Sequence, residues 1–305
     1  MSYECQICGE EFSTEKGLHI HIKKHKVDLA TYYTTYYPRK NLLTGELLPF
    51  KTKKEYFAQD FSTRSQMLKW CLTQDKKVAG EYAVSKLKER IEDKSLKRAP
   101  THLELKIYKL PSIDVFKYAF GSYSAACKKI GYQPLLGKPM DKKFYKDIDS
   151  FSDLEILIDT REQQPLEFPK SKSLKLDFGD YTLGGSDYSY TYVDRKAEQD
   201  FKSTMTIGFE RFRRELQRVK DFDSFLFIVI ESDLNKIYKN NLWGPHKSNL
   251  KYVYHNMRLL MHEFADTCQF IFTGNREKSE HIIPKLLKLG RTMWGVDVQY
   301  FLDQK

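Results

Sequence analysis

The sequence of 305 residues predicts an α/β fold in its C-terminal half, preceded by a small ββα finger and a mostly helical, basic region. In the C-terminal half, short apolar runs typical of strands alternate with amphipathic segments typical of helices. Near the N-terminus, two cysteines and two histidines have the spacing of a small metal-bound finger. We expect strands at residues 154–158, 173–183, 190–193, 225–230 and 270–272, and helices near residues 209–219, 250–264 and 279–289.

The positive charge is concentrated in the N-terminal half. Residues 1–150 contain 28 lysines and arginines against 18 aspartates and glutamates, whereas residues 151–305 contain 23 of each, so the formal net charge of +10 belongs to the first half. A basic segment joined to a neutral domain indicates one part that binds a polyanion such as DNA and another part that acts on it. The alternative interpretation is that the charge serves solubility alone.

The composition argues against a membrane or secreted protein. No run of about 18 apolar residues occurs, and the N-terminus has no apolar signal segment. Of the five cysteines, only Cys5 and Cys8 are near neighbours, so the sequence predicts no disulfide framework. We therefore expect a cytoplasmic or nuclear protein with no membrane partner and no nucleotide cofactor.

Four segments are predicted along the chain: the finger at residues 1–27, a linker and basic helical region at 28–98, a helical repeat at 99–136 and the α/β domain at 150–305. The tyrosine-rich stretch 32–38 is interpreted as a linker, because it is polar and ends in proline. Amphipathic spacing predicts helices over residues 62–93.

The helical repeat contains three helix-start signals at short intervals. Thr101 and Glu104 form a capping box, and Ser112 and Ser122 each precede a further short helix. This segment resembles the helical DNA-binding repeat found beside the catalytic domains of many homing endonucleases. The residues that match are 98–101 (RAPT), 110–112 (LPS) and 120–123 (FGSY). The resemblance implies contact with DNA, and a small structural bundle without a ligand is the alternative.

The metal-ligand pattern of the finger is complete. Cys5 and Cys8 are separated by two residues, twelve residues follow, and His21 and His25 stand one turn apart on one helix face. Two thiolates and two imidazoles at this spacing allow a hairpin and a helix to close a tetrahedral zinc site. The pattern resembles the two-cysteine, two-histidine zinc finger, and a unit of this size depends on its zinc for stability.

The helix of the finger offers few groups that read a DNA sequence. In fingers of this class, the positions that contact bases correspond here to Thr14, Gly17 and Ile20. The side chains of Gly17 and Ile20 cannot hydrogen-bond a base edge. Lys16, Lys23 and Lys24 can contact phosphates, so we expect the finger to bind the DNA backbone or another protein.

One predicted strand, at residues 191–196, presents an acid and a lysine together. Side chains two residues apart on a strand share a face, so Asp194 and Lys196 point the same way. Asp180 joins them if the preceding strand pairs with this one as a hairpin. Carboxylates hold a hard cation and a lysine orients or polarises the attacking water, so this layout suits a metal-dependent nuclease. An exposed, salt-bridged face is the alternative.

These residues resemble the signature of the XPF-type structure-specific nucleases, which have a restriction-endonuclease-like fold. The signature reads G-D, E-R-K, three residues and D. Its counterpart here is Gly179-Asp180, thirteen residues, Asp194-Arg195-Lys196, three residues and Asp200. The resemblance covers about residues 153–290. Residue 194 is aspartate where the family more often has glutamate, and no paired helix-hairpin-helix module follows the domain.

The resemblance implies a metal-dependent DNA endonuclease, of the homing or the structure-specific type. Asp159, Asp180 and Asp194 would bind Mg²⁺ or Mn²⁺, and Lys196 would position the water that attacks phosphorus, leaving a 5′-phosphate and a 3′-hydroxyl. The other residues with implied roles are Glu162 as a further acid, Arg195 on a phosphate or in the wall of the site, Asp200 orienting Arg195 or Lys196, and Arg214 and Arg218 along the DNA backbone.

Other functions remain compatible with the sequence. A non-catalytic DNA-binding or regulatory protein would use the same elements without cutting, and a nuclease acting on RNA is not excluded by charge or fold. One active site per chain cuts one strand, so double-strand cleavage predicts a homodimer or two sequential events.

Overall fold

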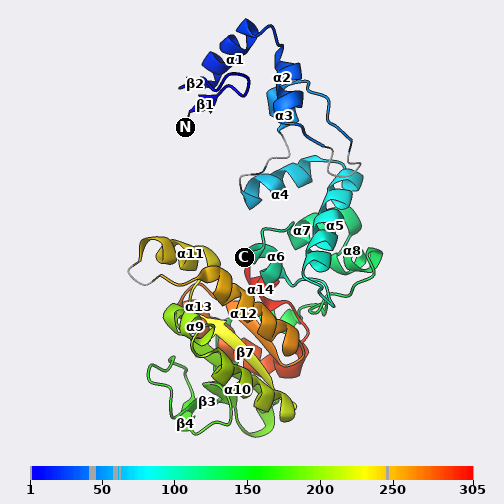
Figure 1. The fold of residues 1–305 in the computed structure, drawn as a ribbon. Helices are drawn as coiled ribbons and strands as arrows, with labels where there is room; N and C mark the ends of the chain where they lie inside the picture. Colours follow the sequence, from blue (N-terminus) through cyan, green and yellow to red (C-terminus); the bar gives the residue numbers. More distant parts are fainter. Residues whose placement is uncertain (1, 41–45, 58–60, 62, 245–246, 305) are drawn as a thin grey trace. The chain divides into compact units, whose positions relative to one another are not determined.

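The computed structural model describes residues 2–40, 46–57, 61, 63–244 and 247–304 (Figure 1). The chain forms two compact units. Unit 1 consists of Met1–Lys94 and Leu110–Ala126, and unit 2 consists of Ser95–Lys109 and Cys127–Lys305. No helix of the described chain combines the length and the apolar composition that crossing a membrane requires.

Unit 1 is built from one small hairpin and a series of helices, as predicted. Its described elements are β1 (Tyr3–Glu4), β2 (Glu11–Phe12), α1 (Glu15–Lys24), α2 (Leu29–Tyr36), α3 (Lys53–Tyr56), α4 (Arg64–Thr73), α5 (Lys76–Asp93) and α7 (Ile113–Phe120). β1 and β2 pair antiparallel and α1 follows them, which confirms the ββα finger. α4 and α5 confirm the helices expected over residues 62–93, although residue 62 itself lies outside the described residues.

The interpretation of residues 32–38 as a linker is wrong. Asp28 caps the N-terminus of α2, which runs through most of this stretch. Tyr32 and Tyr33 are buried in one core with Leu18 and Ile22 of the finger helix, and the Tyr32 hydroxyl accepts a hydrogen bond from the Gln6 backbone at 2.9 Å. A tyrosine ring is largely apolar, so a run that looks polar by composition can pack as a core helix.

The three helices expected within residues 99–136 are present. They are α6 (His102–Ile107), α7 and α8 (Tyr123–Lys129). The capping box of Thr101 and Glu104 forms as predicted, and Gly121 ends α7 in the left-handed conformation at φ 79°. α6 belongs to unit 2 and α7 to unit 1. The resemblance of this segment to a homing-endonuclease repeat stays a prediction.

Unit 2 contains a six-stranded sheet with helices on both faces. Besides α6, its strands and α-helices are β3 (Ile156–Asp159), β4 (Ser171–Leu174), β5 (Tyr181–Leu183), β6 (Thr191–Lys196), α9 (Glu198–Thr204), α10 (Phe209–Asp221), β7 (Phe225–Ile230), α11 (Leu234–Trp243), α12 (Leu250–Glu263), β8 (Cys268–Phe272), α13 (Arg276–Leu289) and α14 (Val298–Leu302). Short 3-10 helices lie at η1 (Lys142–Tyr145), η2 (Ile148–Phe151), η3 (Gly185–Asp187) and η4 (Gly290–Met293). The predicted α/β fold is confirmed.

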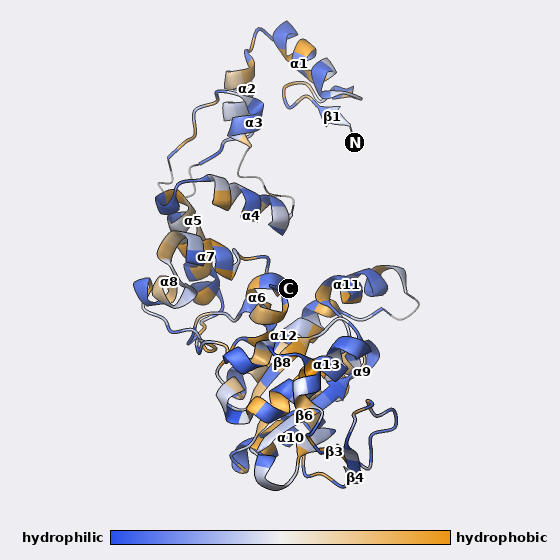
Figure 2. Ribbon diagram, turned by 180° about the vertical axis from the view of Figure 1, so that it is seen from behind, coloured by the Kyte–Doolittle hydropathy of each residue, from blue (hydrophilic) through white to orange (hydrophobic). Residues whose placement is uncertain are grey.

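The sheet has the strand order β4-β3-β5-β6-β7-β8, in which β5 is antiparallel to both of its neighbours and the other pairs are parallel. Alternate residues of β7 face opposite cores. Phe225 and Phe227 pack on the side of α13, whereas Leu226 and Ile228 pack on the side of α9, α10 and α12. A strand covered on both faces must be apolar throughout, which explains its unbroken apolar sequence. Figure 2 shows this apolar interior in orange.

The single strand expected over residues 173–183 is two strands, β4 and β5, with an irregular segment between them. Gly179 lies in this segment at φ +55°, and a Cβ there would come within 2.7 Å of the Val193 carbonyl oxygen. Only glycine tolerates both the positive φ and this close approach to β6. The irregular segment therefore brings Asp180 directly against β6.

Asp303 links the end of the chain to α6 and gives a testable dependence of stability on pH. Its carboxylate accepts hydrogen bonds from His102 Nε2 and Lys106 Nζ, each at 2.7 Å. Burial favours the neutral carboxyl, but these two bonds outweigh burial and lower the pKa of Asp303 from 3.8 to about 2. Because the pKa of Asp303 is lower in the folded than in the unfolded protein, its ionised carboxylate stabilises the fold above about pH 4. This contribution to the free energy of unfolding disappears as the pH falls toward 2.

We expect Asp303→Asn to lower the free energy of unfolding by about 2 kcal/mol at pH 7, measured by urea unfolding. The difference from the unsubstituted protein should shrink steadily below about pH 4. Asp187→Asn, which alters an exposed ion pair with Lys288, serves as the control and should have little effect. Equal stabilities of the Asp303→Asn and unsubstituted proteins at pH 7 would contradict the assignment.

Candidate active site and finger metal site

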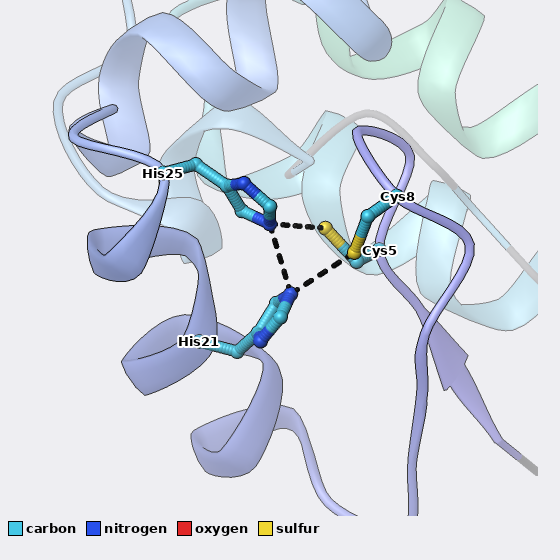
Figure 3. Close-up of side chains that lie close together, drawn as sticks. All are labelled: Cys5, Cys8, His21 and His25. Atoms are coloured by element: carbon cyan, nitrogen blue, oxygen red, sulfur yellow. Dashed lines mark hydrogen bonds between the residues drawn. The ribbon is translucent and has the colours of Figure 1, made fainter.

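The four predicted finger ligands converge on one point. Cys5 and Cys8 come from the hairpin and the turn after β1, whereas His21 and His25 come from the last turn and the C-cap of α1 (Figure 3). The Cys8 Sγ–His21 Nε2 distance is 3.2 Å, the Cys5 Sγ–His25 Nε2 distance is 3.7 Å, and the two Nε2 atoms are 2.9 Å apart. All four atoms lie within 4.8 Å of one another, so the cluster can hold a tetrahedral metal ion.

The finger helix leaves its three lysines, Lys16, Lys23 and Lys24, exposed. The Thr14 hydroxyl accepts a hydrogen bond from the Gly17 backbone at 3.2 Å and so caps α1, and Ile20 is 56% exposed. At the three positions that would contact bases, Thr14 caps the helix, and Gly17 and Ile20 have no side chain that can hydrogen-bond. Contact of the lysines with phosphates stays a prediction.

The predicted hairpin of β5 and β6 forms and brings Asp180 beside Asp194 and Lys196. Tyr181 pairs with Val193 in antiparallel register, and the Asp180 backbone donates to the Val193 carbonyl at 2.7 Å. The Asp180 carboxylate accepts a hydrogen bond from the Arg195 backbone at 2.7 Å. Asp194 and Lys196 share the sheet face opposite to that of Val193, as the two-residue spacing predicts.

The electrostatics of this group are dominated by burial and by mutual repulsion of carboxylates. Burial, followed by the negative charge of Asp194, raises the pKa of Asp180 to about 8. Lys196 Nζ lies 3.0 and 2.8 Å from the two Asp194 oxygens. Burial disfavours the lysine cation, but Asp194 outweighs this effect and raises the pKa of Lys196. The lysine therefore stays charged at neutral pH.

Glu215 is a fourth member of this cluster and lies outside the motifs recognised in the sequence. It lies on α10, its carboxylate accepts a hydrogen bond from the Gly179 backbone, and burial together with Asp194 raises its pKa. The signal that would have found it is its position on the helix. Residue 215 lies three after Phe212 and directly before Leu216, at the border of the buried face, where a charged side chain is uncommon.

Asp159 is held by a different set of contacts. One of its oxygens accepts from Arg161 Nε at 2.6 Å, and the other accepts from Arg161 Nη2 at 2.9 Å and from the Leu176 backbone at 2.7 Å. Burial would raise the pKa of Asp159, but the hydrogen bonds from Arg161 and Leu176 outweigh it and lower the pKa. Both oxygens are therefore occupied by protein donors.

The expected magnesium set of Asp159, Asp180 and Asp194 is not gathered as tightly as the finger ligands. Among the described residues, the one group of three or more cysteine, histidine or acidic side chains placed to hold a metal ion is the cysteine–histidine cluster. The physical reason is that like charges repel and that each carboxylate has a donor of its own: Arg161 for Asp159, the Arg195 backbone for Asp180, and Lys196 for Asp194.

Arg195 is the centre of a second network on the other face of β6. Its guanidinium donates to Glu231 and Glu162, each at 3.0 Å, and to the Gln164 carbonyl at 3.0 Å. Burial disfavours the cation, but these acids raise the pKa of Arg195. Glu162 is therefore paired with Arg195, and the role of Arg195 on a phosphate or in the wall of the site stays a prediction.

The orienting role expected of Asp200 belongs to other residues. Asp200 is exposed in the first turn of α9, and in the described structure Arg195 is oriented by Glu162 and Glu231 instead. Asp200 is the third residue of α9 after the N-cap Ala197, on a side of the helix that faces solvent. Arg214 and Arg218 are exposed on α10, and Arg218 also donates to the Asp177 carbonyl at 3.3 Å.

The ββα unit with its ligand cluster and the separate α/β domain define a zinc finger protein that also contains a larger α/β domain. No protein-family model matches the chain. It is 36% identical over 55 residues to uncharacterized zinc finger protein 70 of Sulfolobus islandicus rod-shaped virus 1. These matched residues are 18% of this chain and 74% of that protein. The chain therefore belongs to the family of that zinc finger protein.

Two solved structures are similar to less than half of the chain. XPF from Aeropyrum pernix is 19% identical with a TM-score of 0.35, over 48% of this chain and 69% of that chain. XPF from Aeropyrum pernix in complex with DNA is 19% identical with a TM-score of 0.34, over 45% of this chain and 64% of that chain.

Proposed function

We propose that this protein is a metal-dependent DNA endonuclease whose active site lies on β5, β6 and α10. The observation that supports the proposal most strongly is the group of three acids, buried Asp194 and half-buried Asp180 and Glu215, around a single half-buried lysine, Lys196. Several charged side chains withdrawn from solvent at one place are uncommon without a function, and titratable groups with shifted pKa values gather at functional sites. Asp180, Asp194 and Lys196 also match the motif of the XPF-type nucleases in sequence.

A divalent cation fits the charge of this group. Three carboxylates lie near one ammonium, and burial, followed by the negative charge of Asp194, raises the pKa values of Asp180 and Glu215. Asp180, Asp194 and Glu215 would hold Mg²⁺ or Mn²⁺, and Asp159 would join them if Arg161 released one of its oxygens. When bound, the cation would stabilise charge on the phosphate and activate a water molecule.

The protein's own residues then have distinct tasks. Lys196 remains protonated through Asp194 and donates a hydrogen bond that orients the attacking water. Gly179 allows Asp180 to approach β6 and donates its N–H to Glu215. Arg195 forms ion pairs with Glu162 and Glu231 and so fixes the wall of the site. Hydrolysis would leave a 5′-phosphate and a 3′-hydroxyl, as the family resemblance implies.

The N-terminal part would deliver this domain to DNA. In this proposal the finger binds zinc as a structural ion, and Lys16, Lys23 and Lys24 contact phosphates without reading the sequence. Arg214 and Arg218 would contact the DNA backbone beside the active site. Cutting of both strands would need a homodimer or two sequential events.

A second candidate function is DNA binding without cleavage. One observation favours it: Asp159 is fully hydrogen-bonded by Arg161 and Leu176, so the acids are not gathered into a metal cage. In that case the α/β domain would be a nuclease-like domain that retains the fold and the affinity for DNA.

The test is cleavage of labelled linear, flapped and forked DNAs by the intact protein, with Mg²⁺, with Mn²⁺ and without a divalent cation. The Asp180→Asn protein, purified in parallel, controls for contaminating nuclease. Cutting that requires the metal and the aspartate supports the proposal. If neither metal allows cutting of any substrate while both proteins bind DNA tightly, the second candidate function holds instead.

Glu215→Gln should lower the cleavage rate about tenfold and raise the Mg²⁺ concentration needed for half the maximal rate. The substitution keeps the shape and the hydrogen bond from Gly179 but removes one negative charge from the metal set. Glu210→Gln, an exposed glutamate on the same helix, is the matched control and should behave like the unsubstituted protein. If the Mg²⁺ titrations of Glu215→Gln and the unsubstituted protein coincide, Glu215 does not hold the cation.

A further inference from the structure

The segment that contains α11 and α12 is more basic than the rest of this half of the chain. Residues 151–305 have no net charge, yet between Asp233 and Glu263 the sequence contains five lysines and arginines and no acidic residue. Large aromatic side chains are interspersed with these cations and are exposed. On α11 itself, Trp243 is 87% exposed and Tyr238 is 58% exposed. An isolated exposed aromatic is ordinary, but a group of them among cations marks a binding surface.

The geometry of α11 brings a cation and an aromatic ring to one place. Lys239 and Trp243 are four residues apart, so they lie on the same side of the helix, one turn from each other. Both line an open hollow of about 520 Å³ between α11 and α9, together with Gln199, Lys202 and Asn240. Glu198, also in this lining, is neutralised by Lys202 at 2.7 Å and therefore does not repel an anion strongly.

Hydrogen bonds connect residues that line this hollow to the ends of β6 and β7, where Lys196 lies. The Glu198 carboxylate accepts from Asn240 Nδ2 at 2.8 Å and from the Ser232 hydroxyl at 3.1 Å. α9 starts two residues after Lys196, and the Glu231 backbone donates to the Lys196 carbonyl. Both views of the fold show α11 and α9 on the same side of unit 2 (Figures 1 and 2).

We infer that this surface, formed by Trp243, Lys239 and the hollow between α9 and α11, binds an unpaired segment of the DNA substrate beside the cleavage site. A base would stack on the indole of Trp243, and the adjoining phosphate would contact Lys239. Stacking uses the ring faces that every base has, so this surface recognises the absence of a second strand and not a sequence. In duplex DNA the bases are covered by their neighbours, so the indole has no free ring face to meet.

The inference rests on the proposed nuclease function in one respect: it takes the bound unpaired DNA to be part of the substrate that is cut. It predicts that flapped or forked DNAs are cut faster than linear duplexes. Binding of single-stranded DNA can be measured without cleavage, so the two proposals fail separately. A protein that binds unpaired DNA through Trp243 and never cuts would refute the nuclease proposal alone.

The experiment compares affinities of the full-length Asp180→Asn protein for a labelled oligothymidine and for a duplex, without chelators, so that the finger keeps its metal. We expect Trp243→Ala to weaken binding of the oligothymidine about tenfold, and Trp243→Phe to retain most of the affinity, because phenylalanine still stacks. Duplex affinity should change less than about twofold. Tyr145→Ala, which removes an exposed aromatic among lysines on η1, is the matched control and should leave both affinities unchanged.

Repeating the binding measurements at higher salt should increase the difference in oligothymidine affinity between Trp243→Ala and its parent. Salt weakens phosphate contacts of the basic N-terminal half, whereas stacking persists. Photocrosslinking of an iodouracil-containing strand should label the peptide that contains Trp243. The inference is wrong if Trp243→Ala binds the oligothymidine as tightly as its parent. It is equally wrong if Trp243→Phe loses as much affinity as Trp243→Ala, if single-stranded and duplex affinities fall together, or if crosslinks form only elsewhere.

Discussion

Replacing Asp180 with asparagine is expected to lower the rate of DNA cleavage by at least about 1,000-fold. The substitution preserves the shape of the side chain and its acceptor for the Arg195 backbone, so β5 and β6 should stay paired. It removes the charge that the proposed cation would bind. Burial, followed by the negative charge of Asp194, raises the pKa of Asp180 to about 8, and a bound metal ion would offset both effects by favouring the charged carboxylate.

The measurement is the single-turnover rate of cleavage with saturating Mg²⁺ and excess protein, together with the DNA affinity of each protein. Asp187→Asn makes the same chemical change at an exposed position on η3 and should cut at the rate of the unsubstituted protein. The affinity of Asp180→Asn for DNA should be equal or higher, since one negative charge is removed. A rate within tenfold of the unsubstituted protein would exclude Asp180 as a ligand of a catalytic metal.

Loss of zinc is expected to unfold the finger. β1 and β2 are two residues each, and Leu18 and Ile22 are among the few buried apolar residues of the ββα unit. Structural zinc contributes on the order of 10 kcal/mol to units of this size, which exceeds what so small a core supplies. We expect one zinc ion per purified chain, none in the Cys8→Ala protein, and rapid proteolysis within residues 1–27 of that variant.

The control is Cys268→Ala, because Cys268 is buried in β8, far along the chain from the finger ligands. That variant should keep one zinc ion and a protected finger. Zinc is measured by displacement into a colorimetric chelator, and protection by limited proteolysis followed by mass spectrometry. The assignment fails if Cys8→Ala retains its zinc or if Cys268→Ala loses it.

Much of the proposed active site followed from local spacing. Asp194 and Lys196 share a face because any strand alternates its side chains, and no knowledge of distant contacts is needed for that conclusion. The four finger ligands followed from spacing for the same reason, because the hairpin and the helix that present them are contiguous in sequence. The capping box of Thr101 and Glu104 is also local, and it formed as predicted.

Residues whose surroundings depend on distant segments were not predictable in the same way. Glu215 reaches the site only because α10 packs against the face of β6 that presents Asp194, and Glu231 replaces Asp200 as a partner of Arg195 because β7 lies parallel to β6. The composition of residues 32–38 predicts a linker, because it does not reveal that residues of the finger bury the tyrosines of α2.

The sequence by itself determined the finger ligands, the α/β class of the second domain and the shared face of Asp194 and Lys196, since each depends on residues within one turn, one strand or one repeating pattern. Only the tertiary structure decided which carboxylates gather around Lys196 and which are held by arginines. The physical reason is that burial and the charge of neighbours from other segments control ionisation and pairing, and those neighbours become neighbours only when the sheet and its helices assemble.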